Sequence, residues 1–141
     1  MRALLVTFVL AALVPDRPDP TPRENAKPLP EQIVGDWLQI QRVIGGIDQP
    51  NPDNRSLAFT RDVMQHVHLR NGMKEPGHKF AYSLDTTKNP AVIRFLDSGT
   101  EGIIKIEGDL LTICYGSQRP GVFVSPANSS ITLVQATRIK R

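Results

Sequence analysis

Short runs of β-forming residues separated by turn residues fill the chain from residue 33 onwards, and this spacing restricts the possible folds most strongly. The separating segments are rich in Gly, Pro, Asn and Asp, which supply the backbone angles that turns require. There is no internal repeat, heptad or sustained 3.6-residue period, and at most residues 30–34 form one helical turn. The pattern predicts strands over 37–44, 56–60, 63–70, 79–84, 91–96, 102–107, 110–115 and 131–139.

Each of these strands has one apolar face, and a set of them must close or stack to bury it. With 141 residues, of which 40% are hydrophobic, the chain is long enough for one domain with a genuine core. We therefore predict an all-β fold, an antiparallel barrel or closed sandwich of about eight strands. On the strand 63–70, the apolar residues Val63, Val67 and Leu69 are predicted to face the core, opposite His66 and His68.

One hairpin can be predicted in register. A two-residue turn at Gly108 and Asp109 pairs Glu107 with Leu110. The continued pairing places the apolar side chains of one face together, namely Ile104, Ile106, Leu111 and Ile113. The opposite face holds Lys105, Glu107 and Thr112, and we expect it to be surface. The turn residues and the apolar pattern agree, as they should for a correct register.

Closure of a barrel brings the first and last strands together. If the strands run up and down and are even in number, the last lies antiparallel to the first, and Trp37 comes close to Arg138. A guanidinium beside an indole favours stacking. Two alternatives stay open. A full additional strand at 122–124, which the flanking prolines disfavour, would separate the pair. Otherwise Trp37 packs on apolar core residues alone and Arg138 is a solvated charge.

The N-terminus has the pattern of a secretory signal, because Met1 and Arg2 precede an apolar run over 3–14. That run is shorter than the roughly 20 residues that a membrane span needs. A Pro-rich segment follows, with prolines at 15, 18, 20, 22, 28 and 30. We predict a signal segment at 1–14, a linker at 15–32 and the β domain at 33–141, and therefore an exported protein, periplasmic or secreted. The alternative is a buried N-terminal strand or helix.

Four stretches carry a resemblance to a known family: Gly35-Asp36-Trp37, then 82–93, 102–115 and 119–123. Together they resemble an uncharacterised lipocalin-like domain family abundant in planctomycete bacteria, over about three quarters of the chain. Two positions depart from its pattern, since Arg94 stands where an aspartate is common and Ile104 where an aromatic residue is common. The resemblance implies an exported bacterial lipocalin-like barrel, in which a Trp–Arg pair closes the ends. It implies no substrate and no reaction.

Candidate chemistry is sparse. His66 and His68 share one strand face, but zinc needs a third ligand, and neither Glu75 nor His78 is fixed nearby. We expect a solvent-facing polar surface there and no metal site. The single cysteine, Cys114, lies between apolar residues without a basic neighbour, which is typical of a buried hydrophobe. Asp85 and Asp109 are turn residues. We therefore predict no catalytic residues, no cofactor and no enzyme.

Two functions from different classes follow from the predicted fold. The first is a non-catalytic binding module that holds a small apolar ligand in or at the mouth of the barrel. The alternative is an envelope protein–protein interaction or inhibitor domain that acts through loops or a sheet edge. A hollow interior favours the first and a filled interior the second. Nucleic-acid binding is not expected, because the net charge is only +3 and basic residues are scattered. The oligomeric state stays open.

Overall fold

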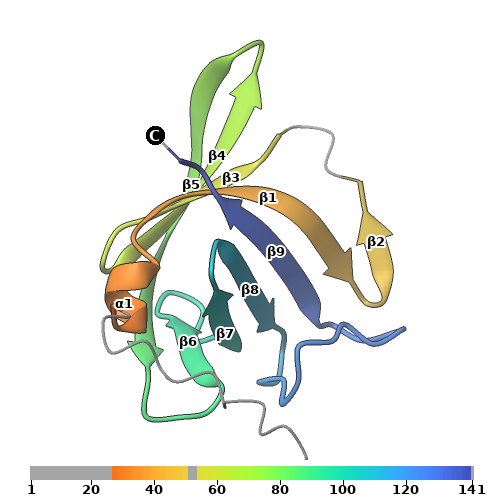
Figure 1. The fold of residues 1–141 in the computed structure, drawn as a ribbon. Coiled ribbons are helices and arrows are strands. Elements are labelled where there is room, and N and C mark those ends of the chain that lie inside the picture. Colours follow the sequence, from red (N-terminus) through yellow and green to blue (C-terminus); the bar gives the residue numbers. More distant parts are fainter. Residues whose placement is uncertain (1–26, 51–53, 141) are drawn as a thin grey trace, which may run out of the picture.

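The computed structural model describes residues 27–50 and 54–140, so the predicted signal segment and most of the linker lie outside the described residues. A short helix precedes the strands (Figure 1). In chain order the elements are α1 (Leu29–Gln32), β1 (Gly35–Ile44), β2 (Ile47–Gln49), β3 (Ser56–Phe59), β4 (Val63–Arg70), β5 (Met73–Asp85), β6 (Ala91–Phe95), β7 (Glu101–Glu107), β8 (Leu110–Tyr115) and β9 (Thr132–Arg138).

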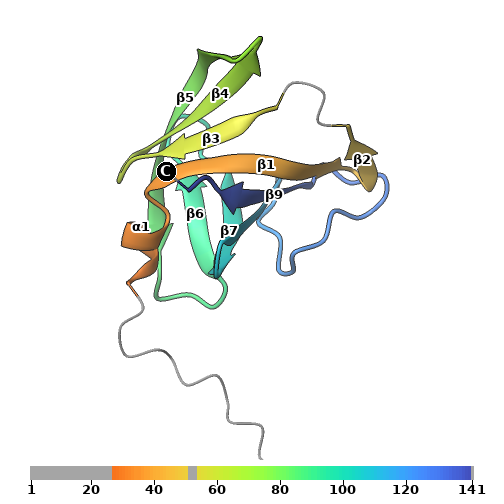
Figure 2. The same cartoon turned by 45° about the horizontal axis from the view of Figure 1, so that its top comes forward.

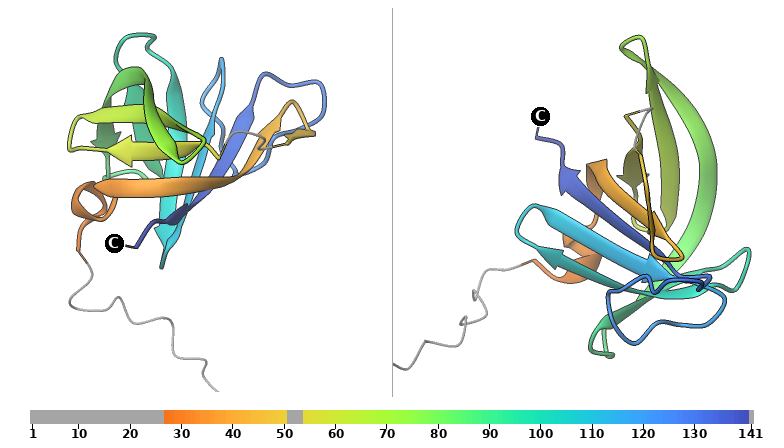
Figure 3. Two further views of the ribbon diagram at one scale, coloured as in Figure 1. Left: turned by 90° about the horizontal axis from the view of Figure 1, so that it is seen from above. Right: turned by 90° about the vertical axis from the view of Figure 1, so that its right-hand side faces the viewer.

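The strands close into an antiparallel barrel. They form one sheet in the order β2-β1-β3-β4-β5-β6-β7-β8-β9, and β1 pairs additionally with β9. Eight strands therefore complete the ring, while β2 lies outside it and pairs with the last residues of β1. The strands curve around a common centre in both views of Figure 3. The predicted all-β antiparallel barrel is confirmed.

The two ends of the barrel differ. At one end, which we call the closed end, α1 leads into β1, and Ile33 and Trp37 are completely buried (Figure 2). Leu29 packs against the same core, so the folded part of the described chain begins a few residues before the predicted boundary at 33. The other end, the open end, carries the turn at 71–72, the connection 96–100 and the loop 116–131. No helix in the described ranges is long and apolar enough to cross a membrane.

The predicted hairpin is confirmed in register. Strands β7 and β8 pair Glu107 with Leu110, Ile106 with Leu111 and Ile104 with Ile113. Gly108 has a φ of +62°, the left-handed conformation that this kind of two-residue turn requires. The apolar face belongs to the main core: Ile104, Leu111 and Ile113 are buried, and Ile106 is half-buried against them.

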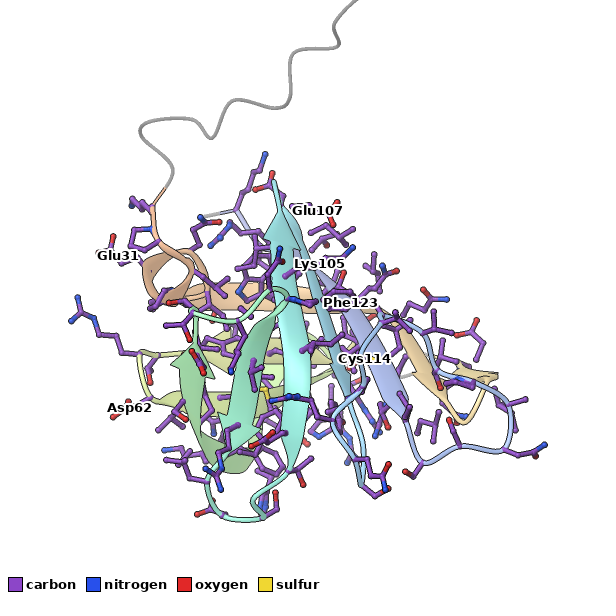
Figure 4. The ribbon with its side chains drawn as sticks, turned by 90° about the horizontal axis from the view of Figure 1, so that it is seen from below. Glu31, Asp62, Lys105, Glu107, Cys114 and Phe123 are labelled. Atoms are coloured by element: carbon purple, nitrogen blue, oxygen red, sulfur yellow. The ribbon has the colours of Figure 1, made fainter. Side chains whose placement is uncertain are left out.

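The opposite face of this hairpin is not the surface that the sequence predicts. Thr112 is only 2% exposed, and its outward neighbours Ile103 and Cys114 are also buried. The loop 116–131 runs over this side (Figure 4): the thiol of Cys114 lies 3.6 Å from the Val124 carbonyl oxygen. Lys105 Nζ stands 4.7 Å from the centre of the Phe123 ring. The loop has no regular strand, as predicted for 122–124, yet it covers part of the outer face of the hairpin with the half-buried Phe123, while Val122 and Val124 stay exposed.

The same loop anchors the turn between β1 and β2. The Gly46 amide donates to Ser125 Oγ over 3.1 Å, and the Asn128 amide donates to the Gly45 carbonyl over 3.2 Å. A Cβ atom at Gly46, where φ is +80°, would come within 2.8 Å of the Ala127 backbone. Glycine is therefore required here by both conformation and space. This contact holds β2, which the sequence analysis did not predict.

Strand β5 is longer than predicted, because its first half, 73–78, pairs with the second half of β4. The two strands turn at Asn71 and Gly72, whose φ values are +50° and +76°, as a primed two-residue turn requires. The resulting hairpin projects beyond the rest of the barrel (Figure 1). Its first β5 residues are exposed and include Pro76, which is why the β pattern is weak there.

Candidate functional site

Two connected pockets open into the barrel from its open end. The larger, which we call the mouth pocket, has a volume of about 190 Å³. It is lined by Met64, His66, Phe80, Phe95, Ser98, Thr100 and Tyr115. A smaller inner pocket of about 20 Å³ shares several of these residues. It is lined by Gln39, Arg42, Leu57, Met64, His66, Phe95, Ile113, Tyr115 and Val134.

A bulge in β1 places Arg42 in the inner pocket. On β9, Ala136 and Val134 both face the core, and their partners on β1 are Gln39 and Arg42. The register shifts between these positions, and Ile40 is consequently half-exposed on the outside. Without the bulge, regular alternation from Gln39 would turn Arg42 outward. A half-buried, charged side chain thus lines the inner pocket where regular alternation would have placed the neutral Gln41.

The inward face of β4 is the reverse of the prediction. Met64 and His66 line the pockets, whereas Val63, Val67 and Leu69 are half-buried on the other side. His66 stands opposite a bulge in β5, where the register passes from Lys79 to Pro76. A Cβ atom at Gly77 would lie 2.9 Å from the His66 carbonyl oxygen, so the close approach of the two strands needs glycine. The apolar composition of one face did not determine which face turns inward.

Positive charge surrounds His66. Burial is the largest cause that lowers its pKa from 6.5 to about 4, and Arg42, Arg55, His68 and His78 lower it further. The imidazole is therefore neutral at pH 7, and Arg42 supplies the fixed charge of the inner pocket. None of the described residues that line the two pockets is acidic.

Aromatic rings form much of the wall of the mouth pocket. Phe80 and Phe95 meet edge to face with ring centres 6.1 Å apart, and Phe95 and Tyr115 do so at 5.7 Å. The His66 ring meets Phe80 at 5.5 Å in the same geometry. Opposite these rings, the hydroxyl groups of Ser98 and Thr100 hydrogen-bond to each other over 2.9 Å in the connection between β6 and β7. The pocket therefore combines an apolar wall with a polar rim, as small-molecule sites commonly do.

The predicted contact between Trp37 and Arg138 is confirmed at the closed end. The two residues are direct partners in the β1–β9 ladder, and the guanidinium lies 4.2 Å from the centre of the indole ring. Arg138 Nη2 also donates to the Gln32 carbonyl over 2.6 Å, and Trp37 Nε1 donates to the Ile33 carbonyl over 2.9 Å. The Asp109 carboxylate stands 3.8 Å from Arg138 Nε. This cluster joins helix, first strand, last strand and hairpin turn, and it has a structural role.

The other candidate residues lie apart from the pockets. Cys114 is buried outside the barrel, and burial raises the pKa of its thiol. The exposed Asp85 accepts hydrogen bonds from the Thr87 hydroxyl and amide, and these bonds lower the pKa of its carboxyl, as in a turn. Among the residues described, no group of three or more His, Cys, Asp or Glu is arranged to hold a metal ion. The expected lack of a zinc site at His66 and His68 stays a prediction.

No protein-family model, curated protein or solved structure matches this chain. The resemblance to a lipocalin-like planctomycete family therefore stays a prediction.

Proposed function

We propose that this protein is a non-catalytic binding module that takes a small apolar ligand at the open end of its barrel. The mouth pocket supports this proposal most directly. Its volume of about 190 Å³ exceeds the roughly 150 Å³ of an engineered apolar cavity that binds benzene. Three aromatic side chains and Met64 supply apolar contact area, and the rim is polar. The closed end is filled by core side chains, so the open end is the expected route of ligand entry.

The lining residues also favour binding over catalysis. No carboxylate or thiol lines either pocket in the part of the chain that the structure describes. His66 is the candidate general base among the described lining residues, but a pKa of about 4 makes it a weak base near neutral pH. No carboxylate among the described lining residues orients it. Nucleophilic catalysis needs a nucleophile beside such a base. The Ser98 and Thr100 hydroxyls are instead paired with each other.

A ligand titration tests this function. We expect small apolar compounds of benzene-like size, such as indole and 3-phenylpropan-1-ol, to bind with Kd values between about 10 μM and 1 mM. The amide signals of Phe95 and Tyr115 should shift in NMR spectra, because these residues line the pocket. Ser98→Phe should weaken binding by filling the mouth, whereas Ser83→Phe, the same change on the exposed face of β5, should not. A folded protein that binds none of a panel of such compounds, acids included, would instead favour the interaction-domain alternative.

We propose in addition that the protein is exported. The sequence pattern at residues 1–14 and the Pro-rich segment after it support this localisation. In its own host, the mature protein should have lost roughly the first 11–20 residues, the usual extent of a signal segment. Intact-mass analysis of the purified protein measures this directly. A product that retains Met1 and the following apolar run would contradict export.

A further inference from the structure

Arg42 is the feature of the pockets that an apolar ligand alone does not explain. Its side chain lines the inner pocket beside Leu57, Ile113 and Val134. Within the described ranges, neither an ion pair nor a hydrogen bond joins that side chain to another residue. Arg42 is half-buried. Removing part of a guanidinium from water without a partner is unfavourable, so an arginine in a pocket wall is normally paired. The bulge in β1 turns it inward nonetheless.

The described groups that act electrostatically on His66 are all basic. Two arginines and two further histidines act on His66 and help to lower its pKa, and no acidic group is among the causes. On the strands that carry these histidines, the nearest carboxylate along the ladder is Glu75, the partner of His68. Glu75 is exposed and lies 3.6 Å from Arg70 at the tip of the hairpin. Arg42 therefore gives the inner pocket a positive charge, and no acidic residue among the described lining residues balances it.

The two pockets differ in chemistry: the inner pocket carries the charged side chain, and the mouth pocket is lined mainly by apolar side chains. The inner pocket, with Arg42 and the buried amide of Gln39, has about 20 Å³, which suits a water molecule or a ligand oxygen. The mouth pocket, with Phe80 and Phe95, is roughly benzene-sized. A ligand that fills both must carry its polar group at one end and its apolar body at the other.

We propose that the ligand is a small apolar carboxylic acid, whose carboxylate binds Arg42 while its hydrocarbon part lies against Phe80 and Phe95. This inference rests on the proposed function and specifies its ligand class. A carboxylate is the planar anion that a guanidinium binds with two parallel hydrogen bonds. It supplies a negative partner for the Arg42 guanidinium, which has none among the described residues. Because the pocket is small, the class is limited to acids with one ring or a chain of comparable length.

The test compares an acid with the alcohol of the same carbon skeleton. At pH 7, 3-phenylpropanoate should bind the wild-type protein at least about tenfold more tightly than 3-phenylpropan-1-ol, since charge-assisted hydrogen bonds exceed neutral ones by this order. Isothermal titration calorimetry gives the affinity of the acid, and NMR shifts give the weaker affinity of the alcohol. This ratio needs no variant, so it does not depend on how well a substituted protein folds.

Variants then locate the anion site. Arg42→Gln should weaken binding of the acid by about tenfold or more and that of the alcohol by less than about threefold, because only the acid uses the charge. Arg94→Gln makes the same change at an exposed position on the outer face of β6 and should leave both affinities unchanged. Circular dichroism confirms that each variant is folded.

The outcomes separate this inference from the function on which it rests. If neither these two compounds nor any other member of the panel binds the folded wild-type protein, the proposed function itself fails. If the alcohol binds as tightly as the acid, the pocket is a site for neutral apolar ligands and the inference is overturned, while the function stands. A preference for the acid that survives in folded Arg42→Gln would also overturn the role of Arg42.

Discussion

Ile113→Asp is expected to prevent folding. Ile113 is 2% exposed and lies in the centre of the β7–β8 hairpin, opposite Ile104 and within the main core. An unpaired carboxylate there would cost on the order of 5 kcal/mol or more. That is comparable with the whole stability of a domain of this size, about 5–15 kcal/mol. Circular dichroism in increasing urea should show no cooperative unfolding transition for this variant.

Matched variants make the result specific. Ser83→Asp introduces the same charge on the exposed face of β5, opposite Arg94, and should change the free energy of unfolding by less than about 0.5 kcal/mol. Ile113→Val keeps an apolar side chain and should cost about 0.5–1.5 kcal/mol. If Ile113→Asp unfolded with the same midpoint as Ser83→Asp, Ile113 would not be a core residue and the hairpin register would be wrong.

The sequence predicted the parts of the fold in which local and global signals agree. In the β7–β8 hairpin, the turn residues Gly108 and Asp109 and the apolar alternation independently specify one register. To predict how the barrel closes, one further step was needed, namely whether the number of strands is even or odd. An even number led to the observed pairing of Trp37 with Arg138. Because 122–124 is not a strand, the ring keeps an even number of strands and the last lies antiparallel to the first.

The errors arose where a strand is apolar on both faces or is covered from outside. On β4, Val63, Val67 and Leu69 suggested the inward face, but a barrel surface also carries apolar residues, so composition did not decide. On β8, alternation placed Thr112 correctly on the outer face. Its burial depends on the irregular loop 116–131, whose path no periodicity predicts. Long-range cover of this kind is a tertiary effect.

The candidate site was largely beyond sequence-based prediction. Counting alternate residues from Trp37 places Gln39 inward and Arg42 outward, and only the bulge reverses the latter. His66 was considered as a metal ligand on a surface, whereas it lies beside Arg42 in a pocket. One usable signal was present: Pro76 and Gly77 interrupt β5 opposite His66, and such residues within a strand often mark a bulge.

The second large effect is expected at the closed end. Trp37 is completely buried, and Trp37→Ala should lower the free energy of unfolding by about 3–5 kcal/mol through the cavity that it leaves. Arg138→Met keeps much of the apolar stem but loses the bond to the Gln32 carbonyl and should cost about 1–3 kcal/mol. Circular dichroism in increasing urea measures both changes. Tryptophan fluorescence would not serve, because the protein has a single tryptophan and the first variant has none.

The energetic value of the stacked pair itself is obtained from a double-mutant cycle. Trp37→Leu and Arg138→Met are measured singly and together, and the guanidinium 4.2 Å above the indole predicts a coupling energy of about 0.5–2 kcal/mol. A cycle of Trp37→Leu with Arg94→Met, an exposed arginine on β6, should be additive within about 0.5 kcal/mol. Additivity in the first cycle as well would show that the indole contributes through apolar packing alone. Barrel closure would then depend on the β1–β9 ladder and on the Arg138 hydrogen bonds to the segment 32–34, without the ring contact.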